Sequence, residues 1–69
     1  MTIGDRVRII ATYGIWKDFY NMEGTITEEF ISVWGCHKFI VHFDSVFHEK
    51  NHPPIIGFDF PDRCLELVK

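Results

Sequence analysis

Gly4-Asp5-Arg6-Val7-Arg8-Ile9-Ile10 is the stretch that decides the fold, together with Asn21-Met22-Glu23-Gly24-Thr25-Ile26-Thr27 further along the chain. Glycine and aspartate favour turns, so the Gly4-Asp5 pair is predicted to launch a first strand. In that strand Val7 and Ile9 alternate with two arginines, which is the period of a half-buried strand. Asn21 and Gly24 are predicted to form a second turn, which returns the chain antiparallel to the first strand.

The second predicted strand is long and irregular. It runs from Glu23 to about Val33 and is rich in β-branched residues, which are common in strands. Its hydrophobic alternation slips beside two adjacent glutamates. We therefore expect a β-bulge near Glu28–Phe30, which would return Ile31 and Val33 to the core face.

The third strand has the clearest pattern. Trp34-Gly35-Cys36 is predicted to be a turn, because Gly35 can adopt a positive φ. The strand follows over Lys38–Asp44, with His42 on its outer face. The residues predicted to face the core are Phe39, Val41 and Phe43.

Two loops interrupt the strand pattern. The segment Tyr13–Asn21 has no steady period and is predicted to be a long first loop. The segment from Ser45 to Pro54 ends in paired prolines, which exclude a central strand and favour an extended loop.

The C-terminal part supplies two short strands. Ile55–Phe58 is predicted to be the fourth, and Cys64–Val68 the last, with Leu65 and Leu67 facing inward. Between them, Pro61-Asp62-Arg63 predicts one helical turn, because proline suits a first helical position. The sequence thus predicts one all-β domain over residues 1–69.

Composition limits the classes of function. The 69 residues carry a formal net charge of −3, which gives no overall attraction to a phosphate backbone. Cys36 and Cys64 are too few for a disulfide framework, and neither a leader peptide nor a membrane-length apolar run is visible. We therefore expect a small, acidic, cytoplasmic protein.

These elements resemble SH3-like barrels, in particular those of the photosystem I subunit IV (PsaE) type and the KOW type. The resemblance covers well over half of the chain, in the right order. It implies a single five-stranded SH3-like barrel with a long first loop and a short 3-10 turn before the last strand. It also implies a non-catalytic adaptor or binding domain. The matching segments are Asp5–Ile10, Trp16, Phe19–Ile26, Phe39–Val46 and Phe60–Val68.

The leading functional hypothesis is a protein-binding module, such as a complex subunit or a regulator, that docks through its aromatic first loop. Aromatic residues make up 16% of the chain, and Trp and Tyr are enriched at interface hot spots. Ile15 belongs to the same loop. Trp16 and Phe19 are expected to be partly buried as plugs, with the other aromatics more exposed. The predicted partner-binding residues are Tyr13, Trp16, Phe19, Tyr20 and Trp34.

Two alternatives from other classes remain open. A KOW-like RNA- or DNA-binding domain would use basic side chains for phosphates and aromatic rings for stacking. Its candidate residues are Arg6, Arg8, Lys17 and Lys38. A third possibility is a small-ligand site created by homo-oligomerisation, since exposed strand edges favour pairing with a second copy.

Metal binding and catalysis are not expected. His48 and His52 have the spacing of a zinc-finger half-site, but Pro53 and Pro54 argue against the helix that would bring them together. Cys36, His37 and His42 supply no second ligand pair. Asp44, Ser45 and His48 lie too close in sequence to converge as a triad. The sequence therefore predicts no metal, no cofactor and no enzyme activity.

Overall fold

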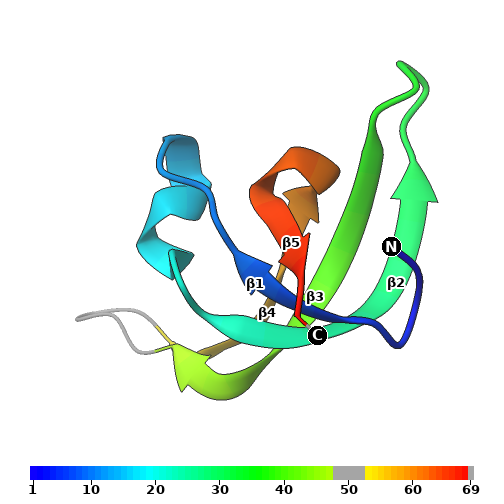
Figure 1. The fold of residues 1–69 in the computed structure, drawn as a ribbon. Coiled ribbons are helices and arrows are strands. Elements are labelled where there is room, and N and C mark those ends of the chain that lie inside the picture. The colour runs from blue at the N-terminus through cyan, green and yellow to red at the C-terminus, as the bar shows by residue number, and fades with distance from the viewer. Residues whose placement is uncertain (48–52, 69) are drawn as a thin grey trace.

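Five antiparallel strands form one curved sheet in the computed structural model, which describes residues 1–47 and 53–68 (Figure 1). Their spatial order is β4-β3-β2-β1-β5. This arrangement confirms the predicted all-β class and the five strands. The described residues show no pairing between β4 and β5, so the sheet is not closed. The strands are β1 (Arg6–Ile9), β2 (Glu23–Ile31), β3 (His37–Phe47), β4 (Ile55–Pro61) and β5 (Leu65–Leu67).

Two 3-10 helices connect the strands. The first, η1 (Gly14–Phe19), lies inside the segment that was predicted to be an irregular loop. The second, η2 (Asp62–Cys64), begins one residue later than predicted, because Pro61 still belongs to β4 and lies opposite Lys38 of β3. The short turn before the last strand is therefore confirmed.

The turn predictions hold in part. Gly4 has a φ of 96°, and the Asp5 N–H donates to the Thr2 carbonyl across the predicted turn. Asn21 has a φ of 71° and is the second turn residue. Gly24, however, lies inside β2, where a Cβ atom would come within 2.8 Å of Val41 Cγ1. Gly24 lets β3 approach β2 closely. A local sequence pattern does not distinguish a glycine in this role from a glycine in a turn.

The bulge in β2 lies at Thr27, just before the predicted position, because the register with β3 shifts between Ile26 and Glu28. The expectation that Ile31 and Val33 return to the core is wrong: they are 67% and 94% exposed. Figure 1 shows the reason, since the β2–β3 hairpin extends beyond the rest of the sheet and has no second layer to pack against.

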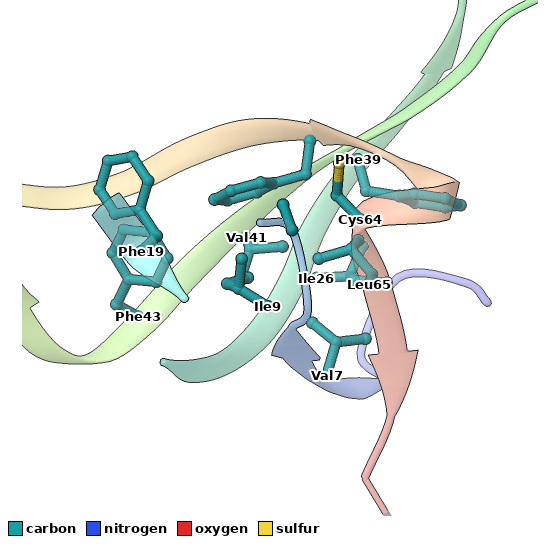
Figure 2. Close-up of a cluster of buried hydrophobic side chains, with 11 residues drawn as sticks. Val7, Ile9, Phe19, Ile26, Phe39, Val41, Phe43, Cys64 and Leu65 are labelled. Atoms are coloured by element: carbon teal, nitrogen blue, oxygen red, sulfur yellow. The ribbon is translucent and has the colours of Figure 1, made fainter. Parts of the chain in front are cut away.

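The core lies on the concave face of the sheet (Figure 2). The three inward residues predicted in β3 are all buried, and His42 is exposed as expected. In β5, Leu65 is buried but Leu67 is 48% exposed, because this strand has only three residues at the end of the sheet. The buried residues are Val7, Ile9, Ala11, Phe19, Ile26, Phe39, Val41, Phe43, Phe60, Cys64 and Leu65.

Phe19 joins η1 to this core. It is 4% exposed, and its ring contacts two rings of β3 and two of β4; the nearest is Phe47 of β3, at a centroid distance of 4.8 Å. The ring centroids lie 5.2 Å from Phe43, 5.0 Å from Phe58 and 5.7 Å from Phe60. These are normal separations for interacting aromatic pairs. Phe19 is thus more completely buried than the partial plug that the sequence predicted.

We predict that Phe19→Ala unfolds much of the protein. Removing a buried phenyl ring costs about 3–5 kcal/mol, which approaches the whole stability of a domain of this size. Urea denaturation of the wild type and the variant measures the loss. Phe19→Leu, which keeps most of the apolar volume, should cost clearly less. Equal midpoints for Phe19→Ala and the wild type would contradict this role.

Candidate functional site

The first loop is held to the body of the protein by three side chains. Besides the buried Phe19, Trp16 Nε1 donates a hydrogen bond of 3.0 Å to the Asp59 carbonyl of β4. Tyr13 Oη accepts a bond of 2.8 Å from Arg63 Nε. The Tyr13 and Trp16 rings meet edge to face at 6.1 Å. These contacts fix η1 at its start, middle and end.

Ile15 and Tyr20 point into solvent, and Tyr13, although it helps to hold the loop, is also exposed. Ile15 is 64% exposed, Tyr20 is 57% exposed and the ring of Tyr13 is 46% exposed. We call these three residues the loop surface. The predicted division of the loop is confirmed, since Phe19 and Trp16 are the more buried residues and the two tyrosines the more exposed. Phe19 is therefore a core residue and is not available for contact with a partner.

Trp34 does not join the loop surface. It is 87% exposed at the tip of the β2–β3 hairpin, which lies on the opposite side of Figure 1 from η1. Ser32 organises this tip: its Oγ accepts the N–H groups of Trp34 and Cys36, and its N–H donates to the Cys36 carbonyl. The structure thus contains two separate exposed apolar surfaces, whereas the sequence analysis grouped Trp34 with the aromatic residues of the first loop.

The two arginines of β1 are engaged by carboxylates. Arg8 lies directly opposite Glu23 of β2 and Glu66 of β5, with N–O distances of 3.5 and 3.2 Å. Arg6 holds Asp44 of β3 with both of its terminal nitrogens and lies 4.0 Å from Glu23. These five residues cross four strands on the outer face, and we call them the ionic ladder. Two positive and three negative charges leave it with a formal charge of −1.

Sequence reasoning identified the arginines but missed their partners. Glu23, Asp44 and Glu66 each sit next to a core-facing residue, so their outward position could be derived from strand alternation. Their contact with Arg6 and Arg8 depends on the register between strands, which the sequence does not give.

The other basic candidates are spread over the molecule. Lys38 Nζ lies 3.8 Å from an Asp59 carboxylate oxygen, whereas Lys17 is exposed in η1. Lys17 lies on η1, Lys38 on β3 and the two arginines on β1. Three of these four predicted phosphate contacts lie beside a carboxylate.

A depression of about 340 Å³ lies beside the ionic ladder. It forms where the chain enters β2 and where β3 loses its pairing with β4, between His42 and Phe47. Its lining is largely polar, and Arg6 already holds the Asp44 carboxylate at its wall. The lining residues are Asn21, Met22, Glu23, Asp44 and Ser45.

The metal candidates are not brought together in the part of the chain that the structure describes. His37 lies 3.4 Å from Glu29 and stacks on Phe39, whereas Cys36 is exposed at the hairpin. No group of three or more metal-binding side chains occurs among residues 1–47 and 53–68. His48, which was also the histidine of the rejected triad, and His52 lie outside the described residues.

Neither η1 nor η2 could cross a bilayer, and no helix among the described residues has the length and apolar character of a membrane span.

Comparison of the chain with protein-family models, curated proteins and solved structures finds no match. The resemblance to SH3-like barrels therefore rests on the residues and on the strand order alone.

The Arg6–Asp44 pair predicts a pH effect. The hydrogen bonds from Arg6 lower the pKa of the Asp44 carboxyl below its ordinary value. A carboxyl whose pKa is lower in the folded state stabilises the fold above its ordinary pKa. This contribution is lost as the pH falls through the folded-state pKa. NMR titration of the Asp44 carboxyl should show the lowered midpoint in the wild type and a higher one in Arg6→Gln. The same midpoint in both proteins would contradict the pairing.

Proposed function

We propose that the chain is a non-catalytic protein-binding module, an adaptor or a small subunit of a complex, built on an open SH3-like barrel. The barrel assignment is supported by the strand order, in which four neighbouring strands follow one another and β5 returns to β1. It is also supported by the 3-10 turn directly before β5. Folds of this kind host many functions, so the functional proposal depends on the surface.

The observation that carries the proposal is the rigid presentation of the loop surface. Phe19, Trp16 and Tyr13 anchor η1 through a buried ring and two hydrogen bonds. Ile15 and Tyr20 are nevertheless more than half exposed. A preorganised loop loses little conformational entropy when it binds, so its exposed apolar area contributes more fully to affinity. Trp16 and Tyr13 would support such a contact, and Phe19 would act only by positioning it.

The RNA- or DNA-binding alternative gains no support from the charges. Three of its four candidate cations, Arg6, Arg8 and Lys38, already lie within 4 Å of a carboxylate. A phosphate would have to displace these carboxylates. If nucleic-acid binding exists, its affinity should fall steeply as salt concentration rises.

We predict that Tyr20→Ala removes a specific partner without changing the stability of the fold. Truncation of an interface hot spot costs about 2 kcal/mol or more in binding free energy, or roughly thirtyfold in affinity. An exposed substitution costs within about 0.5 kcal/mol in folding. The experiment is affinity purification from cells of the source organism with wild-type bait, followed by affinity measurement with the purified partner.

Trp34→Ala is the matched control for this experiment, because it removes an exposed aromatic residue from the other surface. The proposal predicts that Trp34→Ala retains the partner and that Tyr20→Ala and Ile15→Asp lose it. A partner retained equally by all three variants would contradict docking through the loop surface.

A further inference from the structure

The β2–β3 hairpin has a free strand edge. On the β1 side, the backbone bonds of β2 end at Ile26, whose N–H donates to Asp5 and whose carbonyl accepts from Gly4. On the β3 side, β2 stays paired as far as Ile31. Among the described residues, nothing pairs with the outer edge of residues 28–32. Because β4 pairs with β3 as far as Lys38, residues 28–30 form a free edge of the sheet itself, and only the hairpin beyond Phe30 is two-stranded (Figure 1).

The direction of the backbone groups along this edge follows from the hairpin turn. The Ser32 N–H donates to the Cys36 carbonyl, so Ser32 points its N–H toward β3. In an antiparallel pair this orientation alternates along the strand. Glu28 and Phe30 therefore bond to β3, whereas Glu29 and Ile31 direct their N–H and carbonyl groups outward. An edge of this kind is a template for another strand.

Apolar side chains accompany the free edge. Phe30 is 43% exposed and Ile31 is 67% exposed, and Val33 and Trp34 follow at the tip. The edge is held in place by its pairing with β3, which is itself paired with β4, and by the Ser32 turn. It therefore presents unpaired backbone and apolar surface together, in a fixed geometry.

We propose that this edge pairs with the same edge of a second copy of the chain, which forms a symmetric dimer with one antiparallel sheet that continues through both copies. The midpoint of residues 28–32 is Phe30. A two-fold axis at Phe30 uses the whole free edge and puts the outward groups of Glu29 opposite those of Ile31. A register that is shifted along the strand leaves part of the edge unpaired or runs into β1.

The side chains are self-complementary in this register. Phe30 faces its own counterpart, an aromatic cross-strand pair that stabilises sheets. Glu28 faces Ser32 of the second copy, whose Oγ accepts two backbone N–H groups while its O–H proton has no acceptor among the described residues. The Glu28 carboxylate supplies that acceptor. No two carboxylates face each other directly, and Glu29 already lies beside His37.

The same register accounts for the exposed hairpin tip. Beyond Ser32, the hairpin tip of each copy extends toward Ile26 of the second copy, where β2 begins to pair with the segment that leads into β1. The Gly4 N–H donates to the Ile26 carbonyl at this end of β2, and the preceding Met1 and Ile3 are 41% and 57% exposed. Val33 and Trp34 therefore approach an apolar counterpart on the second copy. The loop surface belongs to η1 and is not part of this contact.

Sedimentation velocity over a range of concentrations tests the dimer with the full chain. The wild type should show twice the mass of the chain at high concentration. Phe30→Glu, which places two carboxylates together on the axis, should raise the dissociation constant by more than about tenfold. Ile31→Pro removes an outward N–H that β3 does not use and should do the same. Phe30→Tyr and Ile31→Thr keep the ring and the N–H respectively, and should stay dimeric.

The register has its own test. Directly opposed residues of a non-hydrogen-bonded antiparallel pair have Cα atoms about 4.5 Å apart, which suits a disulfide. In a Cys36→Ser background, Phe30→Cys should form a covalent dimer on mild oxidation, and Glu28→Cys should not. Circular dichroism verifies that each variant is folded. A wild type that stays monomeric at high concentration would overturn the proposal, and so would a dimer that both Phe30→Glu and Ile31→Pro leave intact.

Discussion

The packing of Phe19 against the rings of β3 and β4 is the interaction on which the rest of the structure depends. An open five-stranded sheet has one concave face to bury, and its own strands do not cover that face completely. Phe19 reaches it from η1 and stacks on Phe43 and Phe58. Because η1 follows β1 and precedes β2, this single ring also fixes the path between the two strands. The exposure of Ile15 and Tyr20 follows from it, since the segment cannot turn them inward while Phe19 occupies the core.

The outer face of the sheet is organised by charge. The ionic ladder joins β3, β2, β1 and β5 through two arginines and three carboxylates. Exposed ion pairs contribute little individually, and networks contribute more. The carboxylates of the ladder engage Arg6 and Arg8, two of the four basic side chains that the nucleic-acid alternative would use. The two surfaces that we propose for recognition are apolar: the loop surface at η1 and, separately, the free edge of β2 around Phe30.

Much of the fold could be predicted from the sequence, and the errors have identifiable physical causes. The alternation around Val41 predicted which residues of β3 are buried, because a strand with one buried face has a period of two. The same rule wrongly predicted that Ile31 is buried, because alternation along a strand does not show how far the core extends. The ionic ladder and the separation of Trp34 from η1 depend on strand register and on the length of the hairpin. Neither quantity is encoded in a local pattern.

Nuclear Overhauser effects from the Phe19 ring protons test this account most directly. The account predicts strong effects between the Phe19 ring and the rings of Phe43 and Phe58. The Ile15 and Tyr20 side chains should show none to these core rings. Absence of contacts between Phe19 and the β3 and β4 rings, or their replacement by contacts from Ile15 or Tyr20, would contradict the central role of Phe19.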